Sequence, residues 1–155
     1  MKLHDQVNSF EQGKKLEELG INAKPLFCYC RVSTSVEDGY NDLLPTQWNL
    51  EGLPDLATTW QAPAFTVGEL GVMLPHFDNL SQMGGFVHLT EFDPSIQDGK
   101  PWYCLWEYDK DKENAGFGRE IIDGETEAQA RAEMLIFCLE RQLTTPEEVN
   151  QRLTS

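Results

Sequence analysis

The clearest hydrophobic pattern lies near the end of the chain. Apolar side chains recur there at the three- and four-residue intervals of an amphipathic helix. They are Ala128, Ala132, Leu135, Leu139 and Leu143. The stretch Thr126 to Gln129 precedes them and has the S/T-x-x-E/Q spacing of a capping box, in which two side chains satisfy exposed amides at a helix start. The sequence therefore predicts a C-terminal helix that packs its stripe against the protein.

Three further capping boxes predict shorter helices. Ser9 to Gln12 opens a helix over residues 9–19, which Gly20 ends. The stretch 65–77, "FTVGELGVMLPHF", contains a second box at its start and Pro75 near its end, so it predicts a helix over 66–74. Its glycines lack the spacing of a phosphate-binding loop. The third box, at residues 145–148, carries a proline in the first turn of a last short helix.

Alternating polar and apolar residues predict the strands. Residues 26–34, "LFCYCRVST", alternate after a proline, and residues 86–92 and 102–108 are expected to be the next strands, on either side of a turn-rich segment. The last two are expected to form a hairpin, and a short strand is expected over 119–122.

Residues 35–64 give no clear pattern. They contain three prolines and two glycines, and they predict a long irregular stretch, with short strands near Trp48 and Trp60 as the alternative. Structureless loops of this length are uncommon in compact domains, so the stretch either hides strands or forms a functional surface.

Together these elements predict a single α+β domain over residues 1–155. An antiparallel sheet of three to five strands would pack on the C-terminal helix, and the shorter helices would cover its flanks.

Charge limits the classes of partner. Twelve basic and 26 acidic residues give a net charge of −14, and no lysine or arginine occurs between Val32 and Gly99. Such a surface repels phosphate groups, so direct binding to nucleic acid or to an anionic membrane is not expected. The acidity serves either solubility alone or an acidic face for a basic partner protein.

The chain shows no export or membrane signal. Its first residues, "MKLHDQVNSF", are not those of a signal peptide, and no apolar run is long enough to span a bilayer. A cytoplasmic protein is expected, and its four cysteines should be reduced thiols.

Two stretches could hold metal, and neither fits well. Cys28 and Cys30 share a strand face, but a zinc site needs four ligands, so packing is the favoured interpretation. Asp109 to Glu120 places acids like a calcium loop, yet it lacks the central glycine and follows a strand. A solvated hairpin loop is favoured there. No catalytic motif is present, and no cofactor is expected.

Four segments resemble a known group of proteins. "KLHDQV", "SFEQGKKLEELG", "AFTVGELGVMLP" and "MLIFCLERQL" are similar to segments of small uncharacterised proteins encoded by phages and mobile elements of gut bacteria. That group has no assigned activity, so the resemblance implies a mobile-element origin and a location in the host cytosol, and no functional residues.

The sequence favours a non-catalytic protein-interaction module. Exposed tryptophan near acidic residues would mark a contact surface for an unknown, basic protein partner, and association with a second copy of the chain stays open. The candidate surface residues are Glu37, Asp38, Asp42, Trp48, Trp60, Glu91 and Asp93. The alternative is a small ligand-binding protein or enzyme with a pocket under the 35–64 stretch.

Overall fold

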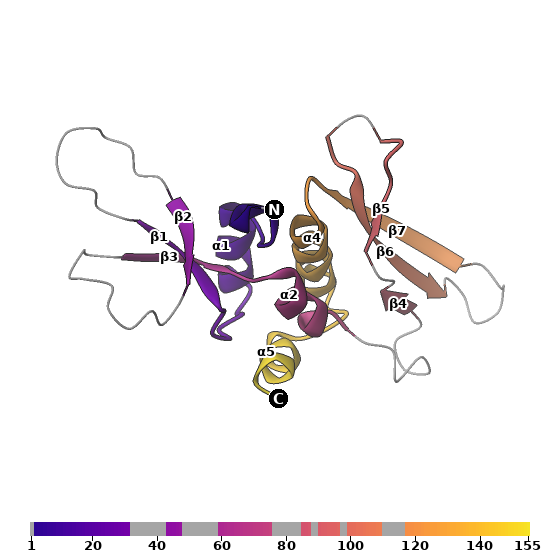
Figure 1. The fold of residues 1–155 in the computed structure, drawn as a ribbon. Coiled ribbons are helices and arrows are strands. Elements are labelled where there is room, and N and C mark those ends of the chain that lie inside the picture. Colours follow the sequence, from indigo (N-terminus) through magenta and orange to yellow (C-terminus); the bar gives the residue numbers. More distant parts are fainter. Residues whose placement is uncertain are drawn as a thin grey trace.

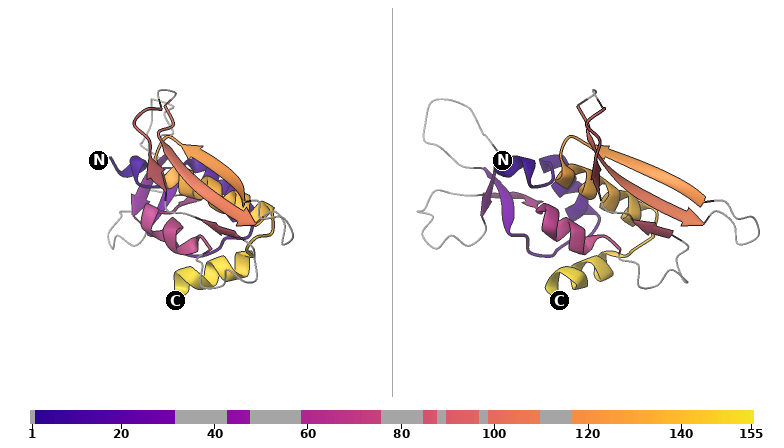
Figure 2. Two further views of the ribbon diagram at one scale, coloured as in Figure 1. Left: turned by 90° about the vertical axis from the view of Figure 1, so that its right-hand side faces the viewer. Right: turned by 45° about the vertical axis from the view of Figure 1, so that its right-hand side comes forward.

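Two antiparallel sheets lie on opposite sides of a group of helices (Figure 1). The computed structural model describes residues 2–31, 43–47, 59–75, 85–87, 90–96, 99–109 and 117–155. In these ranges one sheet has three strands and the other has four. A view turned by 45° shows the same order of sheet, helices and sheet (Figure 2). The predicted α+β class is confirmed, with a second sheet that the sequence pattern did not define.

The first sheet has the strand order β2-β1-β3. Its strands are β1 (Phe27–Arg31), β2 (Leu43–Gln47) and β3 (Thr59–Ala64). The expectation of an irregular stretch over 35–64 is therefore wrong for these two segments, and the alternative of short strands near Trp48 and Trp60 is correct. Pro45 and Pro63 obscured the pattern, because proline argues against a central strand. Both prolines lie on the two edge strands, where a missing N–H is tolerated.

The second sheet is built around β6. Its strands are β4 (Gly85–Val87), β5 (Glu91–Phe92), β6 (Trp102–Asp109) and β7 (Phe117–Gly124). Strands β4 and β5 pair with one edge of β6 and β7 pairs with the other, all antiparallel. The predicted hairpin of residues 86–92 with 102–108 is confirmed in pairing. Strand β7 is longer than the predicted 119–122, because it extends to glycines at 118 and 124 that weaken the sequence signal.

Three predicted helices form as expected: α1 (Phe10–Glu18), α2 (Val67–Met73) and α5 (Pro146–Thr154). Each has both hydrogen bonds of its capping box. In α1 the Gln12 amide donates to Ser9 Oγ over 3.2 Å, and the Ser9 amide donates to Gln12 Oε1 over 3.0 Å. In α2 the glycine in mid-helix has a packing reason, because a Cβ at Gly71 would lie 2.4 Å from a guanidinium nitrogen of Arg131.

Helix α4 (Glu127–Glu140) occupies the centre of the molecule (Figure 1). Strands β6 and β7 pack on one side of it, and α1 and α2 pack on others. Four residues beside the main stripe, three of which the sequence pattern also marks as apolar, are therefore buried as well, so the helix is buried around most of its surface. They are Ala130, Met134, Ile136 and Cys138. The predicted capping box is also incomplete, since Thr126 Oγ1 accepts from the Gln129 amide without a return bond from the Gln129 side chain.

Left-handed residues end α1 and α4. After α1, Gly20 has a φ of 93°, its amide donates to Glu17 O, and the Ile21 amide donates to Leu16 O. These two bonds define a Schellman motif. The same pair of bonds ends α4, where Gln142 has a φ of 57°. The helix therefore stops before Leu143, which the sequence pattern had included in its stripe.

The core has two parts that meet at α1. The larger one fills the space between α1, α2, α4, α5 and the inner face of the four-stranded sheet. The smaller one joins the start of the chain to the three-stranded sheet through Val7, Tyr29, Ala62 and Ala64. Helix α1 approaches β3 so closely that a Cβ at Gly13 would lie 2.2 Å from Pro63 O. A larger residue at position 13 would therefore separate the helix from the sheet.

Candidate functional site

The predicted surface residues do not gather at one described site. Glu37, Asp38, Asp42 and Trp48 lie outside the described residues, and Trp60 lies on β3, where only the backbone is described. Glu91 and Asp93 lie at and just beyond β5, on the other sheet. The described part of the chain therefore places the side chains of the last pair only, and the interaction surface stays a prediction.

Glu91 and Asp93 have different roles. Glu91 is exposed, and its Oε2 accepts a 2.5 Å hydrogen bond from the Tyr103 hydroxyl across the sheet. Asp93 accepts from both the amide and the hydroxyl of Ser95, over 2.9 and 2.6 Å. These bonds from Ser95 lower the pKa of the Asp93 carboxyl. Glu91 thus belongs to the sheet surface, whereas Asp93 shapes a turn.

Trp102 is not an exposed contact residue. It is half-buried, it packs on the larger core, and its ring centroid lies 5.2 Å from that of Phe92. Trp102 shares the face of β6 that also carries the buried Cys104. Contact through Trp48 and Trp60 stays a prediction, because their side chains lie outside the described residues.

The opposite side of β6 and β7 carries a small apolar strip. Strand alternation places it away from α4, because Cys104 and Ile122 face the core. We call this surface the outer face, and its residues are Tyr103, Leu105 and Ile121, flanked by Glu91 and Asp123. Leu105 and Ile121 are opposite each other in the register, and Ile121 is 55% exposed.

No described helix covers the outer face. Figure 1 shows α4 on one side of the β6–β7 pair and no helix on the other, and the first view of Figure 2 agrees. The solvent side of an antiparallel sheet usually carries polar residues. An apolar strip between carboxylates is instead typical of a contact surface with a polar rim. The sequence alone did not predict this strip, because its residues come together only through the pairing register of β6 and β7. The segment "WYCLW" indicated only that part of the strip that lies on β6.

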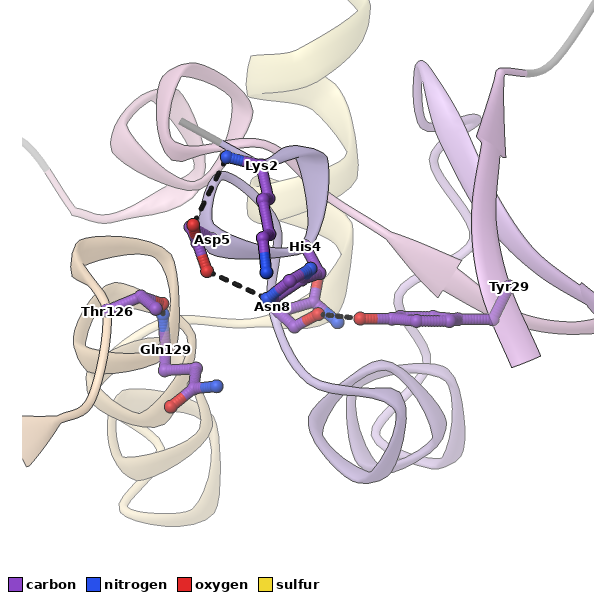
Figure 3. A network of polar contacts seen from close by, with 7 residues as sticks. All are labelled: Lys2, His4, Asp5, Asn8, Tyr29, Thr126 and Gln129. Carbon is purple, nitrogen blue, oxygen red and sulfur yellow. Dashed lines mark hydrogen bonds and ion pairs between the residues drawn. The ribbon is translucent and has the colours of Figure 1, made fainter. Parts of the chain in front are cut away.

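A second polar cluster lies where the chain start meets the first sheet (Figure 3). Asn8 is fully buried, and its Nδ2 donates to Ser9 O and Pro63 O while its Oδ1 accepts from the Phe65 amide. Its carbonyl also accepts from the Tyr29 hydroxyl over 2.5 Å. The side-chain Nδ2, the side-chain Oδ1 and the backbone carbonyl of Asn8 thus all have hydrogen-bond partners within the protein. This cluster holds the chain start against the first sheet and leaves no polar group of Asn8 for a ligand.

A shallow hollow lies beside the end of α1. It has a volume of about 460 Å³, and its lining comes mainly from residues 20–25, with Glu17 and Pro63 at its margin. The backbone amides of Asn22 and Ala23 donate to Asn150 Oδ1, so they do not point into the hollow as free donors. A ligand site usually has several convergent polar groups, and this hollow has few.

The buried cysteines are packing residues. Burial raises the pKa of Cys104 to about 11 and that of Cys138 to about 12. Both thiols are therefore protonated near neutral pH, which makes them poor nucleophiles and metal ligands. Cys28 is buried too, and the side chain of Cys30 lies outside the described residues.

The calcium-loop interpretation does not fit the flanking structure. Asp109 ends β6 and pairs with Phe117 at the start of β7, so strands flank the segment where an EF-hand has helices. Residues 110–116 lie outside the described part. Within that part, no three histidine, cysteine or acidic side chains come together as a metal-ligand group.

No protein-family model matches the chain, and no curated protein or solved structure is significantly similar to it. Among the described helices, none is long and apolar enough to cross a bilayer.

Proposed function

We propose that this chain is a non-catalytic protein-interaction module that binds a basic partner on its outer face. One observation carries the proposal: Leu105 and Ile121 lie side by side on the solvent side of the sheet, next to the carboxylates of Glu91 and Asp123. Apolar contacts at the centre of such a surface supply affinity, and the surrounding charges supply orientation and partner choice. The net charge of −14 favours a basic partner.

A mobile-element origin and a cytoplasmic location belong to the same proposal. Four sequence segments support the origin by their resemblance to phage and mobile-element proteins of gut bacteria. Buried thiols support a reducing compartment, since disulfides are rare there. A partner in that compartment would be a basic host protein, and the acidic surface would compete with nucleic acid for it.

Affinity capture with matched variants tests the proposal. The protein is immobilised and exposed to a lysate of a gut bacterium at low salt and at about 0.15 M salt, where exposed charges are screened over about 8 Å. Ile121→Asn removes the most exposed apolar residue of the outer face. Leu26→Asn is the control, because Leu26 is equally exposed, at 58% against 55% for Ile121, and lies next to β1 on the other sheet.

A basic protein that is lost with Ile121→Asn and kept with Leu26→Asn is the expected result. Its capture should also weaken as salt rises. A partner that both variants retain, or the recovery of no specific partner, would contradict the proposed surface.

A small-molecule binding protein is the second candidate. The hollow beside α1 favours it, and Pro63 connects that hollow with the end of the 35–64 stretch. Its few free polar groups make the outer face the stronger candidate. A ligand found in the hollow would leave Ile121 unaffected, so the same variant separates the two functions.

A further inference from the structure

Among the described strands, β7 is an edge strand of the second sheet. It pairs with β6 along its whole length, from Phe117 to Gly124, and no other described strand pairs with it. In both views of Figure 2 the strand lies at the margin of the sheet. An edge strand of eight residues presents a row of backbone donors and acceptors, which is a template for pairing with another strand.

The sequence of β7 is complementary to itself in antiparallel pairing. Its central residues run Arg119, Glu120, Ile121, Ile122, Asp123. In a pairing centred on Ile121, position 119 of one copy stands opposite position 123 of the other, and this happens twice by symmetry. By register position, each arginine therefore stands opposite an aspartate, and Ile121 stands opposite Ile121 at the centre. Opposite charges and apolar side chains directly across a strand pair stabilise it.

Neighbouring registers are less favourable. A pairing centred on Glu120 brings two carboxylates face to face, and like charges directly opposite destabilise a strand pair. A pairing centred on Ile122 places the apolar Ile121 opposite Asp123. Of the three registers, only the Ile121-centred one places Ile121 opposite itself and position 119 opposite Asp123 on the outer face, and it leaves Glu120 opposite Ile122 on the other face.

The ends of the strand also leave room for a second copy. In the Ile121-centred register, Gly118 stands opposite Gly124, and neither has a side chain. Glycine at both positions therefore places no side chain between the two copies at either end of the pairing. Within its own chain Gly124 has a separate packing reason, because a Cβ there would lie 2.4 Å from the Ala130 amide nitrogen of α4.

We propose that two copies of this chain associate through their β7 edges to form a continuous eight-stranded antiparallel sheet. Both α4 helices lie on the same side of that sheet. The two outer faces join into one apolar strip across the dimer axis, with Ile121 of each copy at its centre. This association deepens the proposed function, because it doubles the surface offered to a partner, but it needs no partner to form.

Sedimentation velocity and light scattering on the purified chain test the association over a range of concentrations up to the millimolar level. The expected species has twice the 17.6 kDa mass of the chain. Asp123→Arg creates two arginine pairs, and Arg119→Asp creates two aspartate pairs. Each should weaken the dimer by about tenfold or more, because two attractive cross-strand pairs become repulsive.

The double variant Arg119→Asp with Asp123→Arg is the matched test. It keeps the composition and the net charge of the chain and restores opposite charges in the Ile121-centred register. It should therefore recover the dimer. Ile121→Lys places a charge at the centre of the pairing and should give a monomer with unchanged circular dichroism, because Ile121 is already exposed.

Three results would overturn the proposal. They are a wild-type chain that stays monomeric at millimolar concentration, a dimer that Ile121→Lys leaves intact, and a double variant that is no stronger than the single ones. Leu105→Asn separates this proposal from partner binding, because Leu105 belongs to the outer face but not to the edge strand. That variant should keep the dimer and lose the basic partner.

Discussion

Replacing Asn8 by alanine should destabilise the protein more than any change at an exposed asparagine. The side chain is fully buried, and its amide joins the start of the chain to residues 63–65, which are 55 to 57 positions away. Nδ2 donates to Ser9 O over 2.7 Å and to Pro63 O over 3.2 Å, and Oδ1 accepts from the Phe65 amide over 2.6 Å. Alanine removes all three bonds and leaves a small cavity.

The expected cost follows from the groups left without partners. Pro63 and Phe65 are themselves buried, so water cannot replace the lost bonds at the carbonyl of the first or the amide of the second. Each buried polar group without a partner costs about 1–3 kcal/mol. We expect a total loss of about 3–5 kcal/mol, a large part of the roughly 5–15 kcal/mol stability of a typical domain.

Denaturant titration, monitored by circular dichroism, measures this loss. The free energy of unfolding should fall with denaturant concentration at the same slope in the variant and in wild type. Asn22→Ala is the control, because the Asn22 side chain is exposed and only its backbone amide is bonded. That variant should change the free energy of unfolding by less than about 0.5 kcal/mol. A loss below about 1 kcal/mol for Asn8→Ala would refute the role assigned to the buried amide.

Asn8→Asp adds a test with a defined pH dependence. The carboxylate can still accept from the Phe65 amide, but its second oxygen would face the carbonyls of Ser9 and Pro63. Burial and this repulsion should raise the pKa of the new carboxyl in the folded state above about 3.9. The folded state then favours the protonated acid, so the stability of the variant relative to wild type should fall as the pH rises above about 4. A difference that stays constant between pH 4 and pH 7 would refute this argument.

The helices were predictable because their signals are local. The boxes that begin at Ser9 and Thr66 fall within four residues, and the side chain and amide that satisfy each other are neighbours in sequence. The end of α4 was missed for the same reason. Gln142 adopts a left-handed conformation without the glycine that normally marks it, so no local residue signalled the stop.

The strand pairing of the first sheet and its long-range contacts were not predictable from local patterns, although its central strand β1 was. Asn8 contacts Pro63 and Phe65, which are 55 and 57 positions away. Nothing in the sequence around a single asparagine identifies such partners. The strands β2 and β3 likewise pair only with β1 among the described strands. Their prolines are tolerated because both strands lie at the edges of the sheet, and a sequence pattern does not show which strands will be edges.

The candidate surface stays a prediction in most of its residues, because the side chains of Glu37, Asp38, Asp42, Trp48 and Trp60 lie outside the described part of the chain. Glu91 lies on the outer face. The described apolar residues of that face are Ile121 and Leu105, whereas Trp102 faces the core. Which side of β6 and β7 faces solvent depends on where α4 packs. The periodicity of each segment alone does not specify that contact.

Three further changes test the burial or the backbone conformation of single residues. Burial, followed by the charge of Glu11, raises the pKa of the Tyr29 hydroxyl to about 12. Since tyrosine in an unfolded chain ionises near pH 10, wild-type stability should fall between about pH 10 and 12, and Tyr29→Phe should lack that component in denaturant titrations over this range. At the end of α4, Gln142→Gly should stabilise the protein by about 0.5–1 kcal/mol, because glycine adopts the φ of 57° without strain but loses more chain entropy on folding. The reverse change, Gly20→Ala, should cost at least about 1 kcal/mol, because its φ is 93° and the new Cβ would lie 3.2 Å from Pro146 Cβ. If the same titration found that Gln142→Gly destabilises the protein, or that Gly20→Ala does not, the left-handed termination of these two helices would be wrong.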